Sequence, residues 1–240
     1  MKSIPRLAFV LTLAAAAMVP LLSCSDSAAA DIVKTERQIG SFQQLEVMDA
    51  VNVYLTQGPA KPAIIETENG AASKVELENS GSSLKIYFTG HSFFSSHHSI
   101  NVYITAPDVN SLGIYGSGDL KIIGKLSSKD SIRISISGSG TVSGELNAPV
   151  VAASIAGAGD IKVRGKTRDL KVSIAGSGDY DGFDLMAENT NVSIVGSGDA
   201  HVYASKALRV STAGSGDVTY AGDPEVHSSI MGSGAVKKKR

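Results

Sequence analysis

A short glycine motif that returns at nearly constant intervals constrains this chain more than any other feature. The pattern Gly-Ser-Gly-Asp, or a close variant of it, occurs seven times between Gly116 and Gly234, and successive first glycines are 22, 19, 19, 20, 18 and 18 residues apart. A repeat of this length cannot enclose a core alone, so neighbouring repeats must stack on one another as in solenoid proteins. The motifs begin at Gly116, Gly138, Gly157, Gly176, Gly196, Gly214 and Gly232.

Apolar residues alternate with polar ones on both sides of each motif. With the first glycine as position 0, position −2 is isoleucine in six of the seven repeats, and position −4 is mostly Leu, Ile, Val or Ala. This period of two indicates strands with one buried face. Because both flanks of the glycines are strands, each repeat is predicted to be one coil of a parallel β-helix, and the glycines form a corner that leaves no room for a side chain or needs positive φ.

Polar residues are predicted to form three outward columns along the stack. Serine occupies position −3 from the second repeat on, serine occupies +1 in all repeats but one, and aspartate occupies +3 in five of the seven. We therefore predict a binding face in these columns. Its candidate residues are Ser117, Asp119, Ser154, Asp160, Ser173, Asp179, Ser193, Asp199, Ser211 and Asp217.

The aspartates need an explanation, because carboxylates one strand apart repel each other by roughly 1 kcal/mol in water. Each Asp could accept backbone N–H bonds at its own corner, or the column could hold a row of Ca²⁺ ions. The first interpretation is favoured because each coil has one Asp at most, with Thr141 and Ala235 in place of two of them. We therefore expect no metal site and no cofactor.

The beginning of the chain is typical of an export signal. Lys2 and Arg6 precede an apolar run from Leu7 to Leu22, which is too short for a membrane span. Leu21-Leu22-Ser23-Cys24 resembles a bacterial lipobox, whereas Ala28-Ala29-Ala30 offers an alternative cut before Asp31. We expect a signal peptide over 1–23, lipidation of Cys24, a tether over 24–38, and an exported outer-membrane lipoprotein of the cell envelope.

Residues 39–115 lack the glycine motif but contain short alternating runs separated by turn signals, such as Gln57-Gly58-Pro59 and Ala106-Pro107-Asp108. We expect these residues to form irregular β coils that cap one end of the solenoid. Residues 116–236 are then the regular β-helix, and 237–240 form a basic tail that protects the edge of the last coil.

Several segments together resemble a known family. These segments are Phe42–Val47, Val51–Gly58, Val102–Pro107 and the glycine series. They are similar to the bacterial family described as putative auto-transporter adhesin, head GIN domain, over residues 39–236. The resemblance implies a right-handed parallel β-helix, here a single domain with the irregular N-terminal cap described above, and it implies adhesion as the function.

Two further groups of residues could contact a partner. Phe93 and Phe94 lie between His91 and His97-His98, where an exposed loop is expected, and no acid within this loop could complete a metal site with the histidines. The two phenylalanines could contact a partner or pack on the cap. The balance of 22 basic and 23 acidic residues gives no footprint for nucleic acid.

Arg133, Lys171 and Arg209 share position −5, close to the serine column. Because their neighbours recur in coil after coil, this arrangement suits a repetitive ligand better than catalysis at one point. We therefore expect a non-enzymatic, surface-anchored solenoid that binds a glycan or another surface partner. Two alternatives are a Ca²⁺-dependent carbohydrate-active enzyme and a scaffold that forms a homo-oligomer through its serine-rich face.

Overall fold

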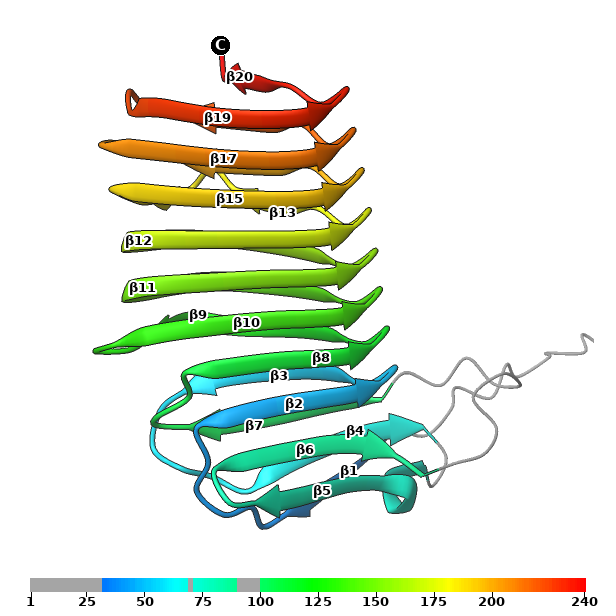
Figure 1. Cartoon of the computed structure of the whole chain (residues 1–240). Helices are drawn as coiled ribbons and strands as arrows, with labels where there is room; N and C mark the ends of the chain where they lie inside the picture. The colour runs from blue at the N-terminus through cyan, green and yellow to red at the C-terminus, as the bar shows by residue number, and fades with distance from the viewer. Residues whose placement is uncertain (1–31, 69–70, 90–99) are drawn as a thin grey trace, which may run out of the picture.

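The chain forms one long stack of β coils in the computed structural model, which describes residues 32–68, 71–89 and 100–240 (Figure 1). The strands are β1 (Ile32–Arg37), β2 (Gln44–Asp49), β3 (Asn52–Gln57), β4 (Ala63–Glu68), β5 (Val75–Ser80), β6 (Ser83–Phe88), β7 (Asn101–Ala106), β8 (Ser111–Gly116), β9 (Asp119–Ser127), β10 (Ser131–Gly138), β11 (Thr141–Gly157), β12 (Asp160–Gly176), β13 (Tyr180–Gly182), β14 (Leu185–Met186), β15 (Asn189–Gly196), β16 (Ala200–Tyr203), β17 (Ala207–Gly214), β18 (Val218–Ala221), β19 (Glu225–Gly232) and β20 (Val236–Lys238). The 3₁₀ helix η1 (Ala71–Lys74) precedes β5. In the described part of the chain, no helix is long and apolar enough to cross a membrane.

Each regular coil has two long sides that meet at the glycine corner. The first side contains β8, β10, the second halves of β11 and β12, and then β15, β17 and β19, which pair in parallel. The second side contains β9, the first halves of β11 and β12, and then β13, β16, β18 and β20, also in parallel. The near strands of Figure 1 run from left to right, and each following coil lies above the last, so the solenoid is right-handed. The predicted fold class is confirmed.

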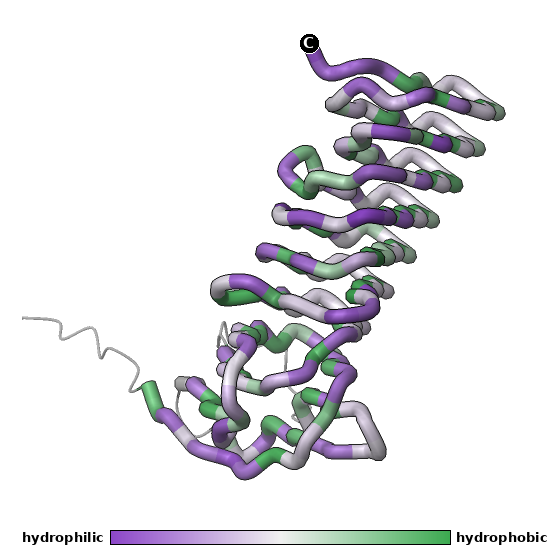
Figure 2. Tube along the Cα trace, turned by 90° about the vertical axis from the view of Figure 1, so that its left-hand side faces the viewer, coloured by the Kyte–Doolittle hydropathy of each residue, from purple (hydrophilic) through white to green (hydrophobic). Residues whose placement is uncertain are grey.

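The core is a set of stacked apolar columns between the two sides. Ile136, Ile155, Ile174 and Ile194 at position −2 are each 1% exposed, and they are partners in consecutive strand pairs. The tube in Figure 2 shows the resulting flat layers, one per coil. All buried apolar residues of the described chain lie between Phe42 and Val218. Residues 32–240 therefore contain every buried apolar residue of the described chain, and we expect them to fold on their own.

The glycine corner needs both of the properties expected of it. The first glycine of every motif has φ between 128° and 148°, a region that side chains disfavour. The second glycine has ordinary φ, but a Cβ there would overlap the carbonyl oxygen of the equivalent residue one coil earlier. For Gly178 that oxygen belongs to Gly159. Consecutive corners thus touch backbone to backbone.

The N-terminal residues form coils of the same solenoid, as expected, but they do not stack in sequence order. β2 lies between β6 and β8 on the first side, and β3 lies between β7 and β9 on the second. The coil made of β2 and β3 is thus inserted between two coils that come later in the chain. Leu45 is fully buried between its strand partners Leu84 and Leu112, so the inserted coil continues the apolar core.

Antiparallel strands close this end of the stack. β4 pairs with both β1 and β7, and β5 pairs with β6, all in antiparallel register. These strands lie at the lower end of the solenoid in Figure 1. They form the irregular cap that the sequence predicts.

Candidate functional site

The first side of the solenoid presents a flat, regular surface that we call the serine face. It consists of the outward residues at positions −5, −3 and −1 of β8, β10, β11, β12, β15, β17 and β19. At −5 it contains Ser111, Arg133, Ala152, Lys171, Asn191, Arg209 and His227; at −3, Gly113, Ser135, Ser154, Ser173, Ser193, Ser211 and Ser229; and at −1, Tyr115, Ser137, Ala156, Ala175, Val195, Ala213 and Met231.

The serines at position −3 form one unbroken column. Ser154, Ser173 and Ser193 are direct strand partners, and the column extends to Ser135 at one end and Ser229 at the other. Their neighbours at −1 are mostly small, so the hydroxyls are half-buried or exposed. Six coils therefore offer one hydroxyl each, spaced by about 4.8 Å, the usual distance between neighbouring strands.

The aspartates at position +3 form a second column, which links consecutive coils. Oδ1 of Asp179 accepts the backbone N–H of Asp199 at 2.9 Å, and Oδ1 of Asp199 accepts the N–H of Asp217 at 2.7 Å. Asp160 and Asp119 make the same bond to the coil that follows them. The predicted partner, an N–H at the same corner, was wrong: the N–H belongs to the next coil, because stacking brings it directly over the carboxylate.

This column begins before the first glycine motif, at a residue that the repeat pattern misses. Oδ1 of Asn52 accepts the N–H of Asp119 at 3.4 Å. Asn52 occupies position +3 of a corner in which Asp49, with φ of 63°, takes the place of the first glycine. The alternation of Leu45 and Val47 was the available signal, since both lie in phase with the later repeats.

Lys237 binds the upper end of the aspartate column. Asp217 Oδ1 accepts the Ala235 N–H at 2.8 Å, and Oδ2 lies 2.7 Å from Lys237 Nζ. The Lys237 ammonium, followed by the Ala235 N–H, lowers the pKa of the Asp217 carboxyl. Part of the basic tail is thus a strand residue of β20, and Lys238 also pairs back, to Asp223 at 3.1 Å.

The structure does not place the predicted serine and aspartate columns on one flat face. Ser154, Ser173, Ser193 and Ser211 lie on the first side, whereas the aspartates begin the second side, past the corner (Figure 1). Ser117 and the other serines at +1 lie on the corner itself and are exposed. The two columns therefore face different directions, because the positive φ of the first glycine turns the chain between them.

The described residues contain no group of three or more His, Cys, Asp or Glu side chains that could hold a metal ion. Each aspartate of the column accepts a backbone N–H with one carboxylate oxygen, and the second oxygen of Asp160 lies 3.6 Å from Lys162 Nζ. Cys24, Phe93 and Phe94, as well as His91, His97 and His98, lie outside the described residues.

An apolar pocket of about 510 Å³ lies in the N-terminal cap. It is formed by the segment before β2, the turn between β5 and β6, and the ends of the loops around β3 and β7. Ile39, Phe42, Ala60 and Pro107 give it its apolar character. This pocket is separate from the serine face.

Known structures share this architecture. A putative adhesin from Bacteroides fragilis is 22% identical and superposes with a TM-score of 0.81, covering 87% of this chain and 97% of its own. A putative lipid binding protein from Parabacteroides distasonis (24% identity, TM-score 0.69) and a putative adhesin from Parabacteroides merdae (17% identity, TM-score 0.68) each cover 88% of this chain and 98% of their own. Among curated proteins, none matches this chain.

The family model places the chain by sequence. The model described as putative auto-transporter adhesin, head GIN domain, matches residues 41–224, which include the inserted first coil, most of the cap and six of the seven glycine corners. The chain belongs to this family.

Proposed function

We propose that this protein is a non-enzymatic adhesive protein of the cell envelope and that it binds a glycan through its serine face. The observation that supports the proposal is the serine column, in which six coils present the same hydroxyl in the same register. A ligand built from repeated units can contact such a surface at every coil, and many weak contacts add up to useful affinity.

The same repetition argues against a catalytic role for the aspartates. General acid–base catalysis needs a few acids in distinct environments with pKa values set apart. Here Asp160, Asp179 and Asp199 make the same hydrogen bond in consecutive coils. Their shared task is to join one coil to the next.

Anchoring at the envelope is part of the proposal. The lipobox-like Leu21-Leu22-Ser23-Cys24 would attach the solenoid through a lipid on Cys24. The cap would then lie nearest the membrane, because it is built from the first coils of the chain. Replacing Cys24 with Ser should release the protein from the membrane fraction. A wild-type protein that is already absent from the membrane fraction would argue for the other cut, after Ala30, because that cut removes Cys24. Retention of the variant would show that a lipid on Cys24 is not the anchor.

A glycan array tests the proposed function. Residues 32–240, labelled at one end, should bind at least one class of extended glycan, and no binding to any glycan would overturn the proposal.

A thermal melt with Ca²⁺ or with EDTA tests the alternative of a Ca²⁺-dependent enzyme, because an ion bound to the folded protein must raise the melting temperature. Light scattering at high concentration tests the alternative of a homo-oligomeric scaffold, because it reports whether the protein associates with itself.

The cap pocket supports lipid binding as a second candidate function. The pocket is apolar, and one structural relative is described as a putative lipid binding protein. Ala60, which is exposed at its rim, offers a probe. Ala60→Trp should block uptake of a fluorescent fatty acid, whereas Ser177→Trp on the distant corner should not. Equal uptake by the two variants would exclude the pocket.

A further inference from the structure

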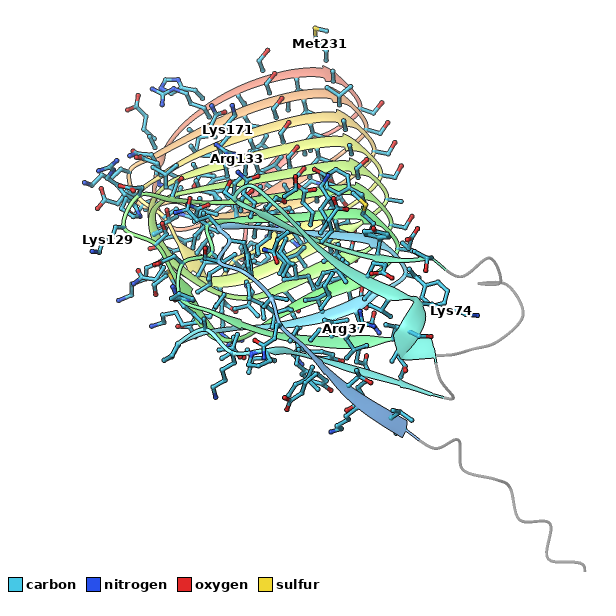
Figure 3. The ribbon with its side chains drawn as sticks, turned by 90° about the horizontal axis from the view of Figure 1, so that it is seen from below. Arg37, Lys74, Lys129, Arg133, Lys171 and Met231 are labelled. Carbon is cyan, nitrogen blue, oxygen red and sulfur yellow. The ribbon has the colours of Figure 1, made fainter. Side chains whose placement is uncertain are left out.

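The serine face has a regular pattern of positive charge. Arg133, Lys171 and Arg209 lie in one column at position −5, on every second coil, with Ala152 and Asn191 between them. All three side chains are exposed. Figure 3, which views the solenoid from below, shows Arg133 and Lys171 on the side that also bears Met231.

These three cations differ from the eight lysines and arginines of the described chain that form ion pairs. Lys125 pairs with Glu145 at 3.0 Å, and Lys206 pairs with Glu188 at 2.7 Å. Arg133, Lys171 and Arg209, by contrast, have no ion-pair partner within the described ranges. Their charges are free to bind a ligand.

The serine face contains no acidic residue, although the chain as a whole has a net charge of −1. Two acids lie two positions further from the corner, at −7, and Glu46 of β2 is the strand partner of Gly113 beyond the cap end of the face. Asp169 is already bound by Arg168 at 2.8 Å and by the Asn189 amide at 2.9 Å, and Glu225 lies 3.0 Å from His227. Between β10 and β17 the face is therefore positive and suits an anion.

One end of the serine column carries an aromatic platform. Gly113 takes the place of serine in β8, and the ring of Tyr115 lies over it, so that a Cβ on Gly113 would be only 3.0 Å from Tyr115 Cε2. Tyr115 is nevertheless 47% exposed. A ring that lies flat on a sheet with one open face can stack against the apolar face of a sugar.

The spacing of the cations along the solenoid indicates the class of ligand. Coils are about 4.8 Å apart, so cations on alternate coils are about 9.6 Å apart. An extended pyranose chain advances by about one coil spacing per sugar. We infer that the serine face binds a linear acidic polysaccharide along the solenoid axis, in which a charged sugar alternates with a neutral one. This inference rests on the proposed function, and it names the glycan class.

In this arrangement each element of the face has its own task. The guanidinium groups of Arg133 and Arg209 and the ammonium of Lys171 pair with the carboxylate or sulfate of every second sugar. The serine hydroxyls hydrogen-bond to the sugar hydroxyls at each coil. Tyr115 stacks on a sugar at the end near the cap.

Binding of hyaluronan, in which glucuronate alternates with N-acetylglucosamine, tests the inference. Residues 32–240 are passed over immobilised hyaluronan and over neutral hydroxyethylcellulose. The wild-type solenoid should bind hyaluronan more tightly. Raising the ionic strength should weaken this binding, because the charges are exposed and salt screens them.

The triple variant R133Q/K171Q/R209Q should bind hyaluronan at least about tenfold more weakly, because three exposed ion pairs of roughly 0.5 kcal/mol each are lost. The matched control neutralises three exposed lysines away from this face, K61Q/K121Q/K166Q. It should bind like the wild type. Since all six side chains are exposed, both variants should fold, which a melting curve verifies.

A second variant tests the aromatic platform without changing charge. Tyr115→Ala should weaken binding to hyaluronan several-fold and leave its salt dependence intact, because the cations remain. Tyr115→Phe should restore binding, since the ring alone makes the stacking contact.

The other outcomes would overturn the inference. Equal binding by the two triple variants would exclude the cation column, and failure to bind hyaluronan would exclude the ligand class. If only neutral glycans bound, the proposed function would stand without the inference. Binding to anionic phosphatidylglycerol vesicles in place of hyaluronan would assign the face to a membrane surface.

Discussion

Tyr180 is a large, fully buried core residue that carries a polar atom. It occupies the inward position +4, where other coils have Leu120, Val142 or Ile161, and its ring is accommodated because Gly182 has no side chain in the way. Its hydroxyl is buried and has no hydrogen-bond partner. Burial raises the pKa of the Tyr180 phenol well above its usual value, so the group stays neutral. A polar atom is thus held in the core without compensation.

Tyr180→Phe should therefore stabilise the protein by about 1 kcal/mol, because removing an unsatisfied buried hydroxyl relieves a desolvation cost of that order. Tyr180→Ala should destabilise it by about 3 kcal/mol through the cavity left behind. Urea unfolding followed by circular dichroism measures both. A loss of stability in Tyr180→Phe would mean that the hydroxyl has a partner after all.

The side chains of the aspartate column can be tested one at a time. Asp199→Asn keeps the oxygen that accepts the Asp217 N–H and removes a charge between Asp179 and Asp217, so it should be at least as stable as the wild type. Asp199→Ala loses the acceptor and should be about 1 kcal/mol less stable than Asp199→Asn. Unfolding midpoints in denaturant give the comparison. Equal midpoints for the two variants would show that the hydrogen bond contributes nothing.

At the scale of the element, the glycine corner couples each coil to the one before it. The backbone N–H of Ser177 bonds to the Gly157 carbonyl at 2.9 Å, and Ser197 bonds to Gly176 in the same way. These bonds form because the glycines have no side chain that would hold the two backbones apart. The corner therefore sets the stacking distance for the whole coil.

Gly178→Ala should cost at least 1–3 kcal/mol, the usual range for overpacking, because the new methyl group would overlap the Gly159 carbonyl and contact Ile155. The control is Ala158→Ser at position +1, which points outward and is serine in all six of the remaining repeats. It should change stability by less than about 0.5 kcal/mol. Thermal melts compare the two, and similar melting temperatures would contradict the tight corner.

At the scale of the whole molecule, surface acids link stability to pH. Lys125 lowers the pKa of Glu145, the Asn189 amide lowers that of Asp169, and Lys237 lowers that of Asp217. A carboxyl whose pKa is lowered by folding stabilises the protein above its unfolded value, and that contribution is lost as pH falls through the folded pKa. We therefore expect the melting temperature to fall as the pH drops from about 5 to about 3.

The variant Asp217→Asn checks this dependence. It removes one of the titrating groups but retains an oxygen for the Ala235 N–H. Its melting temperature should fall less steeply between these pH values than that of the wild type. A slope unchanged by the substitution would exclude Asp217 as a contributor.

The regular coils could be predicted from sequence because their structure follows from a local rule. Ile155, Ile174 and Ile194 recur at a fixed distance from a glycine, and that spacing alone places them in one column. The corner between β2 and β3 escaped prediction because Asp49 and Val51 replace its glycines. The insertion of their coil between later coils depends on pairings such as Leu45 with Leu84, which no local pattern encodes.

The candidate face was predicted in part, for a similar reason. Alternation shows that Ser173 and Asp179 both point outward, but it does not give the angle through which the corner turns the chain between them. Likewise, the sequence identifies an aspartate in a turn but not the N–H that lies over it, because that N–H comes from a residue about 20 positions away. The cation column at −5 was visible, because it follows the same period as the core.

The inserted first coil has a consequence for how the chain folds. Gln44 must find Ser83 and Ser111, whereas strands in the regular region find partners only about one coil away in sequence. Closing long loops costs entropy before any contact repays it, so distant pairings form late. Folding should start among the regular coils and reach the amino-terminal end last. Pulsed hydrogen exchange should therefore protect amides of β12 and β15 before those of β2, so the segment synthesised first would be the last to find its place.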